Sequence, residues 1–407
     1  MASEIELRID RPANGGAGVG RDANGRTVFG EGALPGELVR VELTQEKKRF
    51  ARGSTIEILE AAAGRVEPAC STHRAGCGGC DMAHASIETQ RDIKAHVVRD
   101  ALSRIGRFST EEIEAAWRGF NEQPDQGWYR TTARFAVTGN GLGYRRARSH
   151  SVVLPSECGV VHPRIEEVVL QGRFPKTAGP EVVVRTSAAT GETIVVVDGD
   201  STGVEVPGQA TVLTRAELDA GASASFVEEA AGRTWQVSAD SFFQAGAGVA
   251  SSLVEAVREV AGDVADAHLV DAYCGVGLFA GTVGANAESV TAIEVSASSI
   301  RDAESNLDQQ RADGQTVNIV ASSLEEWSAT KADVVVADPA RSGLGADGVR
   351  ALLACDASRF VLVSCDTGSF GRDAGLLRDA GYALESVRLV DAFRDTSHVE
   401  TVASFRR

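Results

Sequence analysis

Several features are scarce or absent in this chain of 407 residues. It has only 7 cysteines, an odd number and too few for a secreted disulfide scaffold of this length. No window approaches the ~20 consecutive apolar residues that a membrane-spanning helix needs. The first ten residues lack the apolar run of a signal peptide. We therefore expect a cytoplasmic protein without a membrane segment.

Basic residues are fewer than acidic residues, and the excess of acidic residues is confined to the second part of the chain. The formal net charge is -16, yet residues 1–158 carry +1 and residues 159–407 carry -17. Any long-range attraction to a nucleic acid should therefore come from the first part of the chain.

Residues 1–60 resemble a succession of short strands with glycine-rich turns. Ile5–Ile9 alternates with period two, and Asn24-Gly25 is typical of a tight hairpin turn. This pattern predicts a small five-stranded barrel of the OB type. Lys47-Lys48-Arg49 falls on one of its hairpins, either as a solvated turn or as a phosphate-contacting turn beside a stacking Phe50.

The rest of the chain divides by its apolar spacing. Residues 84–118 have the three- and four-residue spacing of a helix. From about residue 265, strands and helices alternate, which predicts a doubly wound α/β domain. Its expected strands are 267–272, 290–294, 317–321, 333–337 and 359–364, closed by an antiparallel pair at 387–393 and 399–405.

One strand of this domain runs into a glycine turn, Gly275-Val276-Gly277. Glu294, at the end of the next strand, can accept hydrogen bonds from both hydroxyls of a ribose. The loop lacks the third glycine of a dinucleotide fingerprint, which disfavours NAD and favours S-adenosylmethionine. The alternative is a turn with only a structural role.

Two further strand ends should face the same crevice. Asp338 follows one apolar strand, and Cys365 follows the next. A thiol ahead of a helix N-terminus can have a lowered pKa and act as a nucleophile. The alternative is an inert buried thiol, which is our interpretation of Cys355.

Four cysteines form a separate group. Their thiolates suit either tetrahedral zinc or an iron–sulfur cluster, and the spacing alone does not choose. Three histidines nearby are alternative ligands. The cysteines are Cys70, Cys77, Cys80 and Cys158, and the histidines are His73, His84 and His162.

Four segments in order resemble the motifs of one family, the S-adenosylmethionine-dependent RNA uracil-5 methyltransferases that make 5-methyluridine in tRNA or rRNA. The resemblance covers nearly the whole chain, and its amino-terminal barrel resembles a TRAM domain, an RNA-binding fold. The segments are Ser238–Gln244, Asp338–Gly343, Ser364–Asp366 and Thr396–Val402.

The resemblance implies roles for particular residues. Cys365 would add to C6 of uracil, and Glu400 would remove the C5 proton. The cofactor and target-base site would be lined by Gln244, Tyr273, Glu294 and Asp338. Cys70, Cys77, Cys80 and Cys158 would hold a [4Fe–4S] cluster, with zinc as the alternative.

The family also implies an RNA partner, with rRNA favoured over tRNA, and we expect a monomer. The rival functions are a non-catalytic iron–sulfur RNA-binding protein and a small-molecule methyltransferase. Basic side chains at 47–49 and at Arg145, Arg146 and Arg148 are the candidate RNA contacts.

Three residues depart from the family pattern. Ala340 replaces a proline, Leu278 replaces an asparagine after the glycine turn, and Asp366 replaces an asparagine. The charge of Asp366 would raise the pKa of the neighbouring thiol. None of the three removes a reacting group.

The predicted architecture therefore has three parts. Residues 1–60 form an OB-like TRAM barrel, and residues 61–235 form a mixed central domain with the cysteines. Residues 236–407 form a Rossmann-like methyltransferase domain, on which the helical segment 84–118 packs.

Overall fold

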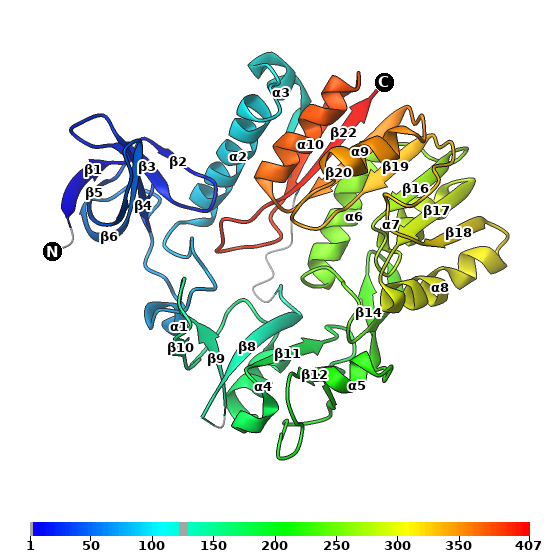
Figure 1. Ribbon diagram of the computed structural model, residues 1–407, viewed down its shortest axis with the longest axis horizontal. Helices are drawn as coiled ribbons and strands as arrows, with labels where there is room; N and C mark the ends of the chain where they lie inside the picture. Colours follow the sequence, from blue (N-terminus) through cyan, green and yellow to red (C-terminus); the bar gives the residue numbers. More distant parts are fainter. Residues whose placement is uncertain (1–2, 122–128, 140) are drawn as a thin grey trace.

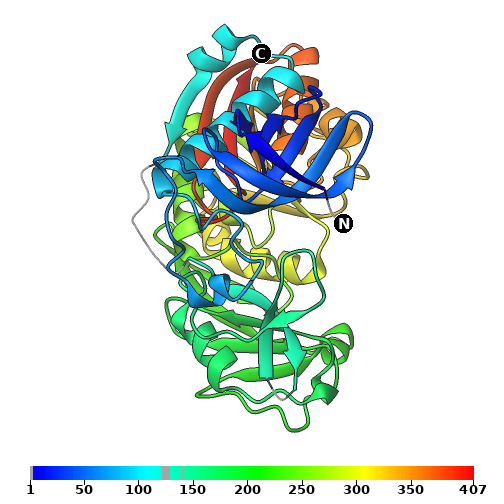
Figure 2. The same ribbon diagram turned by 90° about the vertical axis from the view of Figure 1, so that its left-hand side faces the viewer.

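The computed structural model describes residues 3–121, 129–139 and 141–407. Figure 1 shows the three larger sheets, formed by the amino-terminal, central and carboxy-terminal parts of the chain. The sheet of the central part, called the second sheet below, lies beneath the other two. Figure 2 shows this second sheet again at the lower end of the molecule.

The first sheet has six strands where the sequence predicts five. Their order is β1-β5-β6-β4-β3-β2. A Cβ on Gly20 of β3 would stand 2.0 Å from the Arg8 carbonyl of β1, so the absence of a side chain lets these strands meet. The strands are β1 (Glu4–Arg8), β2 (Arg11–Pro12), β3 (Gly18–Arg21), β4 (Thr27–Glu31), β5 (Leu38–Glu46) and β6 (Phe50–Glu60).

The second sheet is built from the central part of the chain. Its order is β10-β9-β8-β11-β12-β13, and α4 (Pro163–Gln171) packs on β9 and β11. Phe135, Ile165 and Phe174 lie in its core. The strands are β8 (Thr132–Thr138), β9 (Gly141–Arg145), β10 (Val152–Val153), β11 (Glu181–Thr186), β12 (Thr193–Val197) and β13 (Thr211–Thr214), with α5 (Arg215–Asp219) after them.

The largest sheet has eight strands in the order β18-β17-β16-β19-β20-β22-β21-β7, and β22 runs antiparallel to both neighbours. This is the predicted doubly wound α/β arrangement with its closing antiparallel pair. The strands are β7 (Trp117–Phe120), β16 (His268–Ala272), β17 (Ser289–Glu294), β18 (Thr316–Ala321), β19 (Val334–Ala337), β20 (Arg359–Ser364), β21 (Ala383–Val390) and β22 (Glu400–Arg406).

Helices cover both faces of this sheet. One core contains side chains from α6 (Ala247–Ala261), α7 (Leu278–Thr282) and α8 (Ala297–Ala312). The opposite core contains side chains from α2 (Ile87–Arg104), α3 (Thr110–Ala116), α9 (Gly345–Leu353) and α10 (Thr367–Asp379). Because parallel strands between two helical layers are buried on both sides, their sequences are continuous apolar runs.

The helical segment expected over 84–118 consists of two helices, α2 and α3, and its last residues are extended. The helix breaks after Arg104 and restarts at Ser109, whose side chain forms a capping box with Glu112. The chain then becomes extended as β7 (Trp117–Phe120), which adds a parallel edge strand beside β21. Helix α2 lies against α10 (Figure 1).

A hairpin of β14 (Ser225–Ala230) and β15 (Arg233–Ser238) spans the expected boundary at 235/236. It packs against α6 and α8, and its Trp235 is fully buried in their core. The hairpin therefore shares the core of the α/β part, while the three-part division of the chain stays a prediction.

Candidate functional site

The glycine turn after β16 is held by the carboxylate of Glu294. One oxygen accepts the Gly275 N–H at 3.0 Å, and the other accepts the Val295 and Ser296 N–H groups at 2.8 and 2.7 Å. Gly275 and Gly277 have φ of +55° and +91°, which glycine adopts without strain. Tyr273 precedes the turn with φ +65° and is partly buried. The predicted adenosyl-binding loop and its acidic partner thus lie together.

Sequence reasoning missed Asp271, inside the same strand. Its Oδ2 accepts the Ala280 N–H of α7 at 2.7 Å, while its Oδ1 has no partner among the described residues. Burial raises the pKa of Asp271 to about 8. The only signal in the sequence is an acidic residue within an apolar strand.

A hydrogen bond joins Gln244 and Asp338, which lie in separate segments of the chain. The Gln244 Nε2 donates to Asp338 Oδ2 at 3.0 Å. Asp338 directly follows β19, whereas Gln244 lies in the loop before α6. Burial raises the pKa of Asp338 to about 7, and the bond from Gln244 opposes that rise.

Cys365 and Glu400 lie at neighbouring strand ends. Ser364 of β20 pairs with Thr401 of β22, so Cys365 follows one strand where Glu400 begins the other. Glu400 is only 5% exposed, and its Oε2 has no hydrogen-bond partner among the described residues. Burial and the nearby Asp338 raise the pKa of Glu400 to about 8, while Arg341 lowers it.

The expectation of a lowered thiol pKa is wrong. Burial, with Glu400 and Asp338 adding negative charge, raises the pKa of Cys365 to about 12, and Arg341 opposes the shift. The charge of Asp366 is not a cause of it. Its carboxylate instead caps α10 by accepting the Ser369 N–H at 2.8 Å.

Arg341 is therefore a site residue that sequence reasoning named only as part of a motif. It is the cation that acts on both Cys365 and Glu400. Of the other departures from the family pattern, Ala340 is exposed and Leu278 is buried as the first residue of α7.

The four predicted metal-ligating cysteines line a single pocket of about 820 Å³. Burial raises the pKa of Cys77 and of Cys80, and the other thiols of the group add to both shifts. Within the described residues, no three His, Cys, Asp or Glu side chains are close enough to hold one metal ion. His73 also lines the pocket, whereas the ring of His162 caps α4 by accepting the Arg164 N–H.

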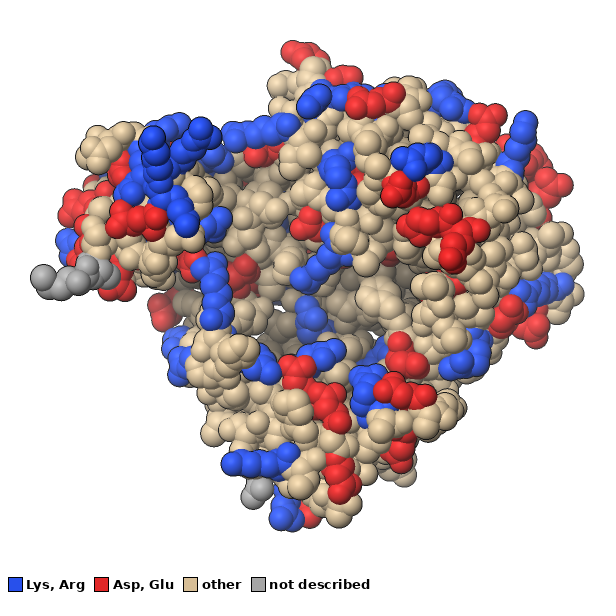
Figure 3. Space-filling model, viewed as in Figure 1, with Lys and Arg blue, Asp and Glu red and all other residues tan. Residues whose placement is uncertain are grey.

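The two predicted basic patches differ. Lys47, Lys48 and Arg49 are exposed at the β5–β6 turn. Arg145 pairs with Glu181 at 2.9 Å, and Arg148 pairs with Glu31 of β4, so both have structural contacts. Figure 3 shows basic side chains over the first sheet and around a hollow at the centre of this face.

The segments that lie outside the described residues carry none of these site residues. Among the described residues, helices that are both long enough and apolar enough to cross a membrane are absent.

Family comparisons agree with this geometry. Residues 227–335 match the family described as tRNA (Uracil-5-)-methyltransferase, and residues 2–56 match the TRAM domain. An uncharacterized RNA methyltransferase of Streptomyces avermitilis is 34% identical, over 99% of this chain and 98% of that protein.

Two further similar proteins have names that specify an RNA and a uracil position. A 23S rRNA (uracil(1939)-C(5))-methyltransferase of Shewanella halifaxensis is 28% identical, over 100% of this chain and 96% of that protein. The crystal structure of a Pyrococcus abyssi tRNA (uracil-54, C5)-methyltransferase with S-adenosyl-L-homocysteine has a TM-score of 0.73 at 21% identity. It covers 98% of this chain and 100% of that chain, and shows the same fold.

Proposed function

Because this chain belongs to the S-adenosylmethionine-dependent RNA (uracil-5-)-methyltransferase family, we propose that it methylates C5 of a specific uridine in ribosomal RNA. The observation that carries the proposal is the cluster of Cys365, Glu400 and Asp338 at the ends of β20, β22 and β19. A nucleophile and a base next to each other are what substitution at C5 of uracil requires.

The proposed mechanism uses the two groups in turn. Cys365 Sγ adds to C6 of the uracil, and the electron pair moves to C5. Bound S-adenosylmethionine would supply an electrophilic methyl group, to which C5 would bond as the methyl–sulfur bond breaks and S-adenosylhomocysteine is left. Glu400 removes the C5 proton, and the electrons of that C–H bond restore the C5–C6 double bond as the Cys365 thiolate departs.

The raised pKa of Cys365 determines what uracil binding and Arg341 have to contribute to the reaction. A thiol with a pKa of about 12 is protonated near neutral pH, so it has to lose its proton as uracil binds. Arg341 favours the thiolate. The cradle around Gly275 and Glu294 would offer hydrogen-bonding groups to the ribose, and Gln244 and Asp338 would line the space between cofactor and base.

We favour ribosomal RNA over tRNA as the substrate because of the sequence identities to two named relatives. The relative that is named for 23S rRNA shares 28% identity along the full length, whereas the tRNA-named structure shares 21%. A uracil in folded RNA also has to be flipped out to reach a crevice of this kind.

The decisive experiment maps 5-methyluridine by mass spectrometry in rRNA and tRNA from cells that lack the protein. We expect one site in 23S rRNA to lose its methyl group and to regain it with wild-type protein, but not with Cys365→Ala. Loss from tRNA alone would replace rRNA with tRNA as the substrate.

We also propose that Cys70, Cys77, Cys80 and Cys158 hold a [4Fe–4S] cluster with a structural role. The four thiols surround one pocket of about 820 Å³. Four thiolates suit either a zinc ion or an iron–sulfur cluster, and the choice of the cluster rests on the family resemblance. Anaerobically purified protein should contain about four iron atoms per chain. Stoichiometric zinc without iron would contradict the proposal.

A further inference from the structure

The loop of residues 391–399 between β21 and β22 leads directly to Glu400. Val390 and Glu400 pair across the two strands, so the loop closes the hairpin that carries the proposed base. The orientation of Glu400 at this strand end therefore depends on how the loop is held.

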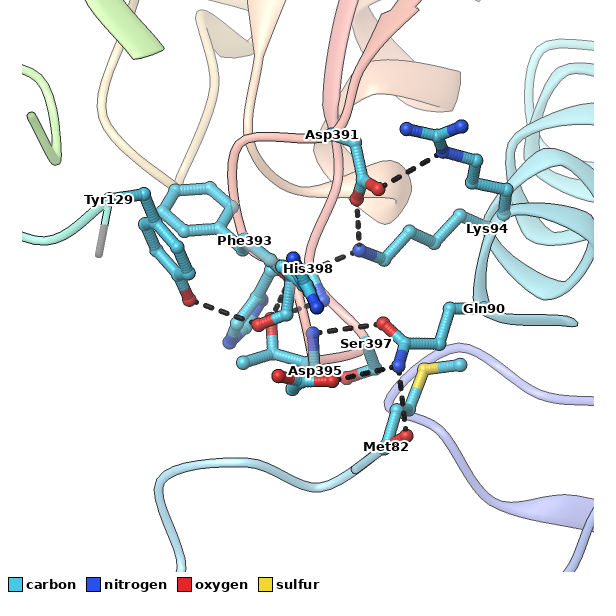
Figure 4. Close-up of polar contacts among 12 residues, drawn as sticks. Met82, Gln90, Lys94, Tyr129, Asp391, Phe393, Asp395, Ser397 and His398 are labelled. Atoms are coloured by element: carbon cyan, nitrogen blue, oxygen red, sulfur yellow. Dashed lines mark hydrogen bonds and ion pairs between the residues drawn. The ribbon is translucent and has the colours of Figure 1, made fainter. Parts of the chain in front are cut away.

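Three groups of bonds tie this loop to the segment 81–94, and Figure 4 labels Lys94 and Gln90 from two of them. The Tyr129 hydroxyl also donates to the Arg394 carbonyl at 3.1 Å. The first group comes from Lys94, which is 1% exposed. Its Nζ donates to Asp391 Oδ1 at 2.6 Å and to the Phe393 carbonyl at 3.0 Å. A buried ammonium with these two partners fixes the beginning of the loop on α2.

The second group centres on Asp395, whose φ of +63° is in the left-handed region. Its N–H donates to Gln90 Oε1 and its carboxylate accepts from Gln90 Nε2, both at 2.9 Å. Its carbonyl accepts the Met82 N–H at 2.9 Å. Gln90 is fully buried, and its Nε2 also donates to the Ala85 carbonyl at 2.9 Å, so its amide joins the loop to the segment before α2.

The third group is closest to the base. Asp81 accepts the Ser397 N–H on Oδ1 at 2.7 Å and the Ser397 hydroxyl on Oδ2 at 2.6 Å. Ser397 stands three residues before Glu400, and Asp81 directly follows Cys80. The barrel also reaches this point, since a Cβ on Gly16 would lie 3.2 Å from the Ser397 Cβ.

We propose that Asp81 is a positioning residue for the proton-removal step, because its two bonds to Ser397 set the loop that orients Glu400. The cysteine-rich segment thereby acts on the last chemical step from a distance. This inference rests on the proposed role of Glu400. Carboxylate-to-N–H bonds of this kind are among the stronger ones in proteins.

The test separates methyl transfer from release of the product. Asp81→Ala and wild-type protein are mixed with a 23S rRNA transcript and radiolabelled cofactor in single-turnover reactions. We expect methyl transfer to RNA within about twofold of wild type and release slowed by about tenfold, because misplacing a reacting group by 1 Å can cost 10²-fold. A covalent protein–RNA complex carrying the label should then accumulate on a denaturing gel.

Companion variants make the result specific. Asp81→Asn keeps an acceptor for the Ser397 N–H and should restore most of the release rate. Asp92→Ala, at an exposed position on α2, is the matched control and should behave as wild type. Ser397→Ala removes only the hydroxyl bond and should trap less complex than Asp81→Ala.

Two outcomes would overturn the inference. One is that Asp81→Ala slows methyl transfer and release equally. The other is that it folds and binds cofactor but traps nothing. If Asp81→Ala does not fold, Ser397→Ala decides on the same criterion.

A parallel reaction with Glu400→Gln keeps the two proposals distinguishable. Trapping by Glu400→Gln without trapping by Asp81→Ala rejects the positioning role alone. No trapping by Glu400→Gln rejects Glu400 as the base.

Discussion

At the scale of single residues, the site combines a half-buried thiol with three acidic groups whose pKa values are raised. Burial raises the pKa values of Glu400, Asp338 and Asp271 to between about 7 and 8, and that of Cys365 to about 12. Such raised values are common where proton transfer has to occur near neutral pH. These carboxyl and thiol groups can therefore bind protons near neutral pH in the RNA-free protein.

The nucleophile gives the first prediction. Cys365→Ala should bind S-adenosylhomocysteine as wild type does and form no 5-methyluridine, because no bond to C6 can form. Calorimetry and single-turnover methylation measure the two effects. Cys355→Ala, in the core behind the sheet, is the control and should still methylate RNA. Turnover by Cys365→Ala at a tenth of the wild-type rate would remove Cys365 from this role.

A second prediction concerns the charge of Glu400. Its pKa of about 8 lies below that of the thiol, so Glu400 is ionised while Cys365 titrates. Glu400→Gln removes this negative charge, so the pKa of Cys365 should fall by about one unit. The rate of Cys365 alkylation by iodoacetamide at pH 9 to 10, where Glu400 is ionised in the wild type, should therefore rise about tenfold. Glu385→Gln, exposed on β21, should leave it unchanged.

At the scale of elements, a strand of the second sheet holds the loop that carries Gln244. Arg185 of β11 is 5% exposed, and its Nη1 donates to the carbonyls of Ser238, Ala239 and Ser241 at 2.7 to 2.8 Å. Asp302 of α8 accepts two further bonds from Ser238. The turn before Gln244 is thus fixed by two different elements.

Removing that donor gives a third prediction. Arg185→Met should lower the free energy of unfolding by about 3 kcal/mol, because three buried carbonyls lose their partner. The shift of the urea midpoint measures this. Arg134→Met on the neighbouring strand β8 is the control, because its ion pair with Glu181 is exposed and should contribute less than about 1 kcal/mol. Equal shifts for both variants would contradict the role of Arg185.

The elements of the α/β part were the most predictable from sequence. The expected strand 359–364 matches β20, and the others end within a few residues of the observed strands, since apolar runs mark strands buried on both faces. Strand β7 was missed because Trp117–Phe120 is too short to show a period. Arg185 and Asp81 were missed because their roles depend on contacts with residues far along the chain. Cys365, Glu400 and Asp338 came from motifs.

At the scale of the whole molecule, the two basic patches differ in how much of their charge is available to RNA. The first sheet exposes Lys47, Lys48 and Arg49 at the β5–β6 turn. Arg145 and Arg148 instead bind Glu181 and Glu31, so part of their charge is already neutralised. The β5–β6 turn is therefore the better candidate for binding phosphates.

This difference gives a fourth prediction. Reversing the charge of Lys47, Lys48 and Arg49 should weaken RNA binding and reduce the log–log salt slope by about 0.7 to 0.9 for each phosphate that is no longer neutralised. The measurement is a salt titration of the dissociation constant. The matched control reverses Arg301, Lys331 and Arg350, exposed on the α/β part, and changes the net charge equally. Identical slopes for both triple variants would contradict a special role for the turn.

The edge strand β7 has a consequence for how the protein is made on the ribosome. Trp117 pairs with Val387, about 270 residues further along the chain. At 5–20 residues per second, β7 and α2 leave the ribosome on the order of half a minute before their partners exist. The first sheet can form during that time, but the α/β sheet acquires its β7 edge only after β21 has been made. Strand β7, the first strand of this sheet to be synthesised, is thus the last to pair. The amino-terminal half of the chain therefore has to stay soluble until β21 has been made.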